Sequence, residues 1–283
     1  MKTTVKSKIV AYVVSAILIV FCLFPIYWML ITSLKTSTEI YKIVPTFWPK
    51  KLTFEGYYEL FAEKGFMKNV LNSLFVSLIV SFGSIAISMP AAYAIARIKF
   101  RGRKQVSKGI LISYLMPRTV LFIPLYLLVT KIGLSNNLWG LVLVYPTITI
   151  PYATWMMISY FKSIPYDLEE AAIIDGCSRV QAMWKICFPL ARPGIVSTLI
   201  FSYTLCWSEY LYALVIINKA DFKTIPLALA DMVVGDVYAW GPLMGGSLIA
   251  SIPVIILYLL CNRNLVGGKI GRASCRERVC STV

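Results

Sequence analysis

The sequence predicts an all-α fold, namely a polytopic membrane protein with six transmembrane helices. Of its 283 residues, 58% are hydrophobic and only 14% are charged, whereas a soluble chain carries about a quarter charged residues. The apolar residues lie in long continuous runs, which excludes disorder and an ordinary soluble domain. The net charge is +15, and most basic residues flank the apolar runs. We therefore expect them to orient helices in a lipid bilayer and not to bind nucleic acid.

Six apolar runs are long enough, or nearly so, for a helix that crosses a hydrocarbon core of about 30 Å. The six runs are 9–31, 70–96, 109–129, 138–160, 194–217 and 243–260, of which the last is the shortest. The first is too long and too aromatic for a cleaved signal peptide, so we expect a retained helix. Membrane helices tolerate proline because neighbouring groups satisfy the freed carbonyls. The runs contain Pro25, Pro90, Pro117, Pro124, Pro146, Pro151 and Pro253.

The connections between the runs differ in charge. The segment 2–8 and the connection 97–108 carry basic residues and no acid, and the segment after residue 262 is also strongly basic. The positive-inside rule predicts that both termini and the connection 97–108 are cytoplasmic. With six spans, the long connection 161–193 between the fourth and fifth runs is then cytoplasmic as well.

Several kinds of chemistry are excluded by composition. The chain has no histidine, which removes histidine triads, metal sites and proton relays. None of its 7 cysteines has CxxC spacing, so we expect neither a zinc site nor a disulfide framework. The stretch Gly267-Gly268-Lys269 lacks the other residues of a phosphate loop, and no nucleotide-binding motif occurs elsewhere. We expect a chain that cannot itself hydrolyse ATP and that binds no cofactor or metal itself.

The connection 161–193 is patterned like two short helices. Pro165 suits the start of the first helix, and the acidic residues that follow place negative charge at the positive end of its dipole. Gly176 breaks this helix, and Ser178 with Gln181 forms a capping box that starts the second.

The second helix has apolar residues at helical spacing, which predicts one apolar face: Val180, Met183, Trp184 and Cys187. Pro189 and Pro193 are expected to end it before the fifth span. An exposed amphipathic element of this kind lies on the membrane or docks into a groove of another protein. A surface hairpin that packs on its own bundle is the alternative.

The same connection resembles a known motif. Its spacing is Glu170-Ala171-Ala172, three residues, Gly176, nine residues, then Ile186-Cys187-Phe188-Pro189. This resembles the EAA loop of ABC-importer permeases, with Phe188 in place of the usual leucine. Further segments resemble the binding-protein-dependent sugar permeases, specifically their MalG-like branch: Ile123-Pro124-Leu125-Tyr126, Ile164-Pro165, Ile174-Asp175-Gly176 and Trp207-Ser208-Glu209-Tyr210.

The resemblance implies a permease domain over residues 1–268, with its EAA loop at about 161–193, in the plasma membrane of a bacterium or archaeon. It implies a second permease subunit, two cytoplasmic ATPases that bind ATP and Mg, and an extracytoplasmic sugar-binding protein. The resemblance favours a second permease that is a different chain. The EAA loop would couple the permease to an ATPase. The coupling residues would be Glu170, Ala171, Ala172, Asp175, Gly176, Ile186, Phe188 and Pro189.

Charged residues inside a membrane are costly and often functional. Glu209 in the fifth run and Arg118 in the third are expected at similar depths. They line a translocation path, or they form a buried ion pair, or Glu209 bonds to the partner permease. Aromatic residues near Glu209 suit either stacking on sugar rings or ordinary helix packing: Tyr203, Trp207 and Tyr210.

Other functions stay open from the sequence. A secondary, ion-coupled transporter would favour an internal repeat and buried relay residues. An ABC permease for another small solute and a membrane scaffold are further alternatives. The segment 269–283 changes character abruptly and resembles vector-derived read-through, so we expect it to be non-native.

Overall fold

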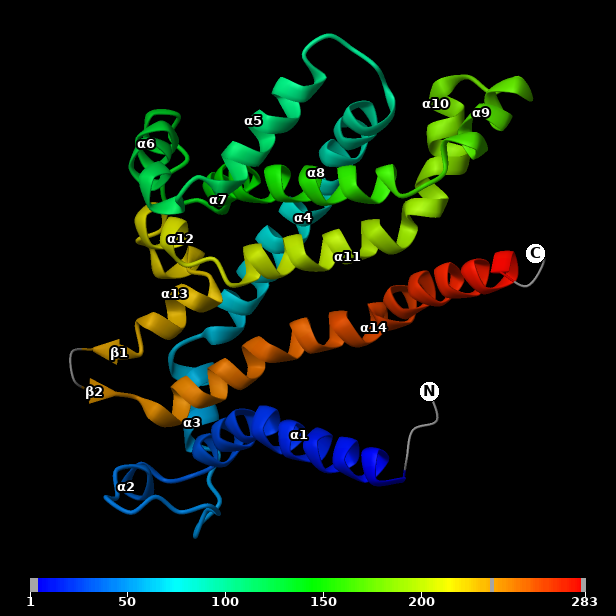
Figure 1. Cartoon of the computed structure of the whole chain (residues 1–283). Coiled ribbons are helices and arrows are strands. Elements are labelled where there is room, and N and C mark those ends of the chain that lie inside the picture. Colours follow the sequence, from blue (N-terminus) through cyan, green and yellow to red (C-terminus); the bar gives the residue numbers. More distant parts are fainter. Residues whose placement is uncertain (1–4, 235–236, 281–283) are drawn as a thin grey trace. The chain divides into compact units, whose positions relative to one another are not determined.

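The computed structural model describes the backbone of residues 5–234 and 237–280, and the side chains of residues 8–233 and 238–261. The segment 269–283 lies outside the described side chains. The chain divides into two compact units, the first of residues 1–67 and 228–253 and the second of residues 68–227 and 254–283. Both units are built almost entirely of helices (Figure 1), which confirms the predicted fold class.

The first unit holds the first helix of the chain, several short elements and the start of the last helix. Its strands β1 and β2 are antiparallel and pair Val233 with Tyr238. Its elements are α1 (Val5–Ser33), α2 (Ser37–Ile40), α3 (Glu55–Tyr58), the π-helix η1 (Glu59–Glu63), β1 (Val233–Val234), β2 (Val237–Tyr238) and the beginning of α14 (Trp240–Cys280).

Within this unit, α1 presents an apolar surface and the segment after it is held by a carboxylate. Every side chain from residue 8 to residue 26 is exposed, as suits a helix that faces lipid. In the segment after α1, Glu39 accepts hydrogen bonds from Thr46 Oγ1 at 2.6 Å and from the Lys50 N–H at 3.1 Å. The Thr46 bond lowers the pKa of Glu39 against the opposing effect of burial.

The second unit contains most of the helices. Its elements are α4 (Phe66–Arg97), α5 (Arg103–Leu115), α6 (Arg118–Lys131), α7 (Leu138–Val144), α8 (Pro146–Lys162), α9 (Tyr166–Ile174), α10 (Arg179–Ala182), the π-helix η2 (Met183–Cys187), α11 (Phe188–Trp207), α12 (Leu211–Ile216), the 3-10 helix η3 (Ala220–Phe222), α13 (Ile225–Ala230) and the rest of α14. Figure 1 shows α9 and α10 projecting from one end of α8 and α11.

The six predicted spans are recovered, four of them as expected. Among the described residues, five helical segments are long and apolar enough to cross a membrane, and a sixth results if the bent pair α5 and α6 counts as one span. The runs 9–31, 70–96, 138–160 and 243–260 correspond to α1, α4, α7 with α8, and the first half of α14.

The third run is not a single helix, contrary to the expectation for 109–129. The chain bends by 93° between α5 and α6. Pro117 causes the break, because proline disfavours helical dihedrals in the residue before it, and Met116 is extended with ψ at 131°. Pro117 was expected to be tolerated inside a span, which is wrong. Proline is tolerated inside other helices, at Pro25, Pro90, Pro124, Pro151 and Pro253.

The fifth run also differs from its prediction of one helix over 194–217. Helix α11 ends at Trp207, residues 208–210 interrupt it, and α12 begins at Leu211. The interruption places Glu209 between two helices and not inside one. The described span therefore runs from Arg179 to Trp207.

Small and hydroxyl-bearing residues let the helices of the second unit approach closely. One side of α4 buries Ser73, Ser77, Ser81, Ser84 and Ser88. Ser84 and Thr149 of α8 share a hydrogen bond of 2.6 Å between their hydroxyl oxygens. A Cβ at Gly194 of α11 would lie 2.3 Å from the Tyr160 ring of α8. Such small-residue contacts are typical of helix packing in membranes, where no hydrophobic force joins the helices.

Candidate functional site

The connection between α8 and α11 begins as its sequence predicts. Helix α9 follows Pro165, and its first turn contains Asp167 and Glu169. The helix ends at Ile174, and Gly176 adopts a φ of +91°, a left-handed conformation that favours glycine. The turn is closed by the Cys177 N–H, which donates to the Ala172 carbonyl at 2.9 Å.

The predicted capping box is present at the start of α10. The Gln181 N–H donates to Ser178 Oγ at 3.3 Å, and the Ser178 N–H donates to Gln181 Oε1 at 2.8 Å. These two reciprocal bonds satisfy donors that would otherwise be free at the helix start.

The second helix does not stop at Pro189 and Pro193, so that prediction is wrong. Instead α10, η2 and α11 follow one another without a gap. Directly before Pro189, the Phe188 N–H donates to the Met183 carbonyl in a wider π-turn. Pro189 lies in the first turn of α11, where its missing N–H costs little. The loop is thereby continuous with the fifth span.

The apolar residues of this second helix divide between two environments. Met183 and Cys187 are buried, whereas Val180 and Trp184 are 61% and 60% exposed. On α9, Ile174 is 84% exposed and Ile173 is partly exposed. We name Ile173, Ile174, Val180 and Trp184 the exposed apolar set of the loop. Large apolar side chains exposed together on one loop are typical of an interaction site.

The predicted coupling residues are mostly accessible. Ala172 and Phe188 are buried, and Ile186 is half-buried. Exposed are Glu170, Ala171, Asp175, Gly176 and Pro189. Glu170 therefore points away from the bundle and can meet another protein.

The neighbouring carboxylate, Glu169, is a site residue that the sequence reasoning missed. It is 6% exposed and accepts hydrogen bonds from the Tyr93 hydroxyl and, at 3.5 Å, from Cys187 Sγ. Its Oε2 lies 3.6 Å from Arg97 Nε. From the sequence, the acids in the first turn of α9 predict only a favourable interaction with the helix dipole. Arg97 predicts only the side of the membrane on which its connection lies. The available hint was a basic residue at the end of a long apolar helix, together with two adjacent acids in the loop.

Glu209 has a structural role that was not foreseen. Its carboxylate accepts hydrogen bonds from the Tyr212 N–H at 3.1 Å and from the Ala213 N–H at 3.3 Å. These are donors at the start of α12, so Glu209 caps that helix where α11 has ended. It is 4% exposed. The predicted ion pair with Arg118 is not formed within 4 Å in the described part of the chain, and Arg118 is exposed.

The aromatic residues near Glu209 lie within the packing of the second unit. Tyr203 and Trp207 are buried and their rings stack with centroids 5.5 Å apart. Tyr210 is half-buried. These rings present little surface to a solute in this conformation.

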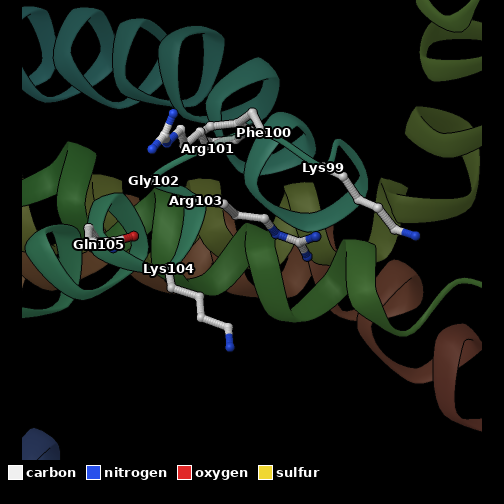
Figure 2. A pocket seen from close by; sticks show the side chains of 7 residues that line it. All are labelled: Lys99, Phe100, Arg101, Gly102, Arg103, Lys104 and Gln105. Carbon is white, nitrogen blue, oxygen red and sulfur yellow. The ribbon is translucent and has the colours of Figure 1, made fainter.

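A basic hollow lies on the connection between α4 and α5. It measures about 500 Å³ and is lined by residues 99–105. Figure 2 shows the side chains of Lys99, Arg101 and Lys104 pointing in different directions. Since they do not converge on one point, they are arranged as a spread of positive charge along the connection. Among the described residues, no group of three His, Cys, Asp or Glu side chains is placed to hold a metal ion.

These features define a class of protein, a multi-pass helical membrane protein with a helical loop between α8 and α11 that exposes large apolar side chains. The sequence matches the family of the binding-protein-dependent transport system inner membrane component over residues 84–263. The chain belongs to this family and is an ABC transporter permease. The ion-coupled transporter and the scaffold considered above are therefore excluded.

Several permeases are similar in sequence to almost the whole of this chain. The inner membrane ABC transporter permease protein YcjP of Escherichia coli is 33% identical over 93% of this chain and 94% of its own. A diacetylchitobiose uptake system permease of Streptomyces coelicolor is 31% identical over 95% and 97%. The trehalose/maltose transport system permease MalG of Thermococcus litoralis is 31% identical, with the same coverage. In fold, the chain is similar to a bacterial ABC transporter that imports alginate, with a TM-score of 0.73, 24% identity and coverage of 93% and 98%.

Replacing Glu209 tests its role as a helix cap. Glu209→Ala removes both acceptor oxygens from a buried site and should lower the free energy of unfolding by about 1–3 kcal/mol. Glu209→Gln keeps one acceptor oxygen and should lose less. Thermal unfolding of the purified complex in detergent measures both, with exposed Glu63→Ala as the control. Equal losses for the alanine and glutamine variants would contradict the capping role.

Proposed function

We propose that this chain is the permease subunit of a carbohydrate importer and that its 161–193 loop couples it to an ATPase. The observation that carries the proposal is the exposed apolar set beside exposed Glu170. Relatives named for diacetylchitobiose and for trehalose/maltose transport support a mono- or oligosaccharide as the solute.

The complex is proposed to contain four kinds of subunit: this chain, a second and different permease, two cytoplasmic ATPases that bind ATP and Mg, and an extracytoplasmic sugar-binding protein. A similar fold has been seen in a bacterial alginate transporter in complex with a pentasaccharide-bound periplasmic protein. The exposed apolar surface of α1 supports contact with lipid or with the second permease.

The orientation follows from the charge of the connections. The basic segment 97–108 carries no acid, so we place it, both termini and the 161–193 loop in the cytoplasm. Coupling requires this side, because ATP is available there.

The proposed mechanism is alternating access. ATP binding draws the two ATPases together, and each carries its bound loop with it. The spans then change from an inward-open to an outward-open state. ATP and the loaded binding protein shift this equilibrium because each binds one state more tightly than the other.

Docking is tested at Trp184. Trp184→Glu places a charge in the proposed interface, which should reduce co-purification of the ATPases about tenfold or more, since an interface anchor is worth about 2 kcal/mol or more. The matched control is Trp48→Glu, because Trp48 is 68% exposed but lies in the segment predicted to be external. Equal retention of the ATPases by both variants would rule out docking through this face.

The turn between the two loop helices is tested at Gly176. Gly176→Asp adds a negatively charged side chain at the exposed turn, on a left-handed backbone that aspartate adopts at a cost of about 1 kcal/mol, and should lower uptake and stimulated ATPase activity together. Gly65→Asp is the control, because Gly65 also has a positive φ, of 59°, and open space around it. Full uptake and full ATPase stimulation in Gly176→Asp would refute the coupling role.

The substrate class is tested by uptake into proteoliposomes that contain the whole complex and its binding protein. A panel of labelled mono- and oligosaccharides should include at least one that accumulates only when ATP is present. Labelled amino acids and peptides serve as controls. Accumulation of one of these, with no sugar transported, would show that the solute is not a carbohydrate.

A further inference from the structure

The last turn of helix α4 contacts the 161–193 loop, although α4 is distant from this loop in the sequence. The loop is joined covalently to α8 and α11, whereas α4 is separated from it by the whole of α5 to α8. Two residues one helical turn apart on α4, Tyr93 and Arg97, nevertheless reach the same carboxylate of α9, that of Glu169. Both carboxylate oxygens are engaged.

Arg97 also holds the chain that leads into α9. Its Nη2 donates to the Ile164 carbonyl at 2.7 Å. Its guanidinium carbon lies 4.2 Å from the centre of the Tyr166 ring, within the range of a cation–π interaction. The Tyr166 hydroxyl in turn donates to the Ala96 carbonyl of α4 at 2.9 Å. The last turn of α4 therefore holds α9 at its start and along its first turn.

The same carboxylate contacts the second half of the loop. Cys187 of η2 donates its thiol to Glu169 Oε2, the oxygen that faces Arg97 Nε. Below these groups lies an apolar cluster that includes Phe161, Met183 and Phe188. Glu169 thus joins three elements, α4, α9 and η2, next to this apolar cluster.

The ion pair is buried, but two of the hydrogen-bond donors of Arg97 have no partner in the described part of the chain. The side chains of Arg97 and Glu169 are 1% and 8% exposed. Arg97 Nε and Nη1 have no hydrogen-bond partner in the described part of the chain, and 3.6 Å between Nε and Oε2 is longer than a hydrogen bond. Stability alone does not account for such a pair, since well-packed apolar residues serve stability equally well or better. Spare donors leave the pair free to tighten or change partners as α9 shifts.

We propose that Arg97 and Glu169 are positioning residues of a joint that passes the movement of the loop to α4. The joint comprises Tyr93, Arg97, Glu169 and Cys187, and the inference rests on the proposed coupling function. Two consecutive residues of α9 would then have different roles. Glu170 faces outward to the ATPase, and Glu169 faces inward to α4. Helix α4 then moves with the loop, together with α8 and α11.

The test compares single and paired neutralisation in the whole complex. Arg97→Met and Glu169→Gln each leave one buried charge without a partner and should destabilise the complex. The double variant removes both charges and should restore thermal stability. It should also hold the ATPases at wild-type stoichiometry. Sugar uptake per ATP hydrolysed should nevertheless fall about tenfold, within the range typical of coupling between sites.

The control is a second ion pair, Lys64 with Glu59, which is 3.1 Å long and partly exposed. The double variant Lys64→Met with Glu59→Gln should keep normal uptake per ATP. The inference is overturned if the Arg97→Met, Glu169→Gln double variant transports within about twofold of wild type. It is equally overturned if that variant fails to hold the ATPases, because the pair would then only shape the docking face.

Trp184→Glu, measured in parallel, separates the inference from the proposed function. If Trp184→Glu keeps its ATPases, docking through the loop is wrong. If Trp184→Glu loses them while the Arg97 and Glu169 double variant stays fully coupled, docking stands and only the joint is wrong.

Discussion

A buried carboxylate is the constraint on which the arrangement of the 161–193 loop depends. A carboxyl group taken out of water needs polar partners, and Glu169 finds them at Tyr93 and Arg97 of α4 and at Cys187 of η2. Satisfying that one group brings together segments that are more than 70 residues apart in the chain. The loop is therefore not a free hairpin, because Glu169 joins its two halves to each other and to the end of α4.

A second constraint is that backbone groups in a membrane must be satisfied within the protein. Where Pro117 interrupts the third span, the chain bends by 93° and starts a new helix. Where α11 ends, Glu209 supplies its carboxylate to the first free N–H groups of α12. A buried carboxyl group thus satisfies backbone donors at a break between two helices. This accounts for a buried glutamate without requiring contact with a solute.

Features that depend on neighbouring residues could be predicted from the sequence, and features that depend on distant ones could not. The capping box of Ser178 and Gln181 and the turn at Gly176 are local, and both are present. The role of Glu169 depends on Tyr93 and Arg97, which no local pattern connects to it. The bend at Pro117 had a local cause, but other prolines lie inside helices. The positions of the prolines alone therefore do not show which of them breaks a helix. Likewise, helical spacing groups Val180 with Met183, yet only Met183 is buried, in a cluster that includes residues of α4 and α8.

The two adjacent acids of α9 show how one short helix can contact α4 on one side and leave its other side open to a partner. Consecutive residues of a helix are 100° apart, so Glu169 and Glu170 cannot both face the same neighbour. One is buried against α4 and the other is exposed. A helix of only 9 residues has too little surface of its own to resist being pulled out of place by a docked partner. In the proposed mechanism, the tyrosine contacts and the buried ion pair on its inner side would hold it in place. A force applied at the outer face would then be transmitted to the spans and not lost in local unfolding of the loop.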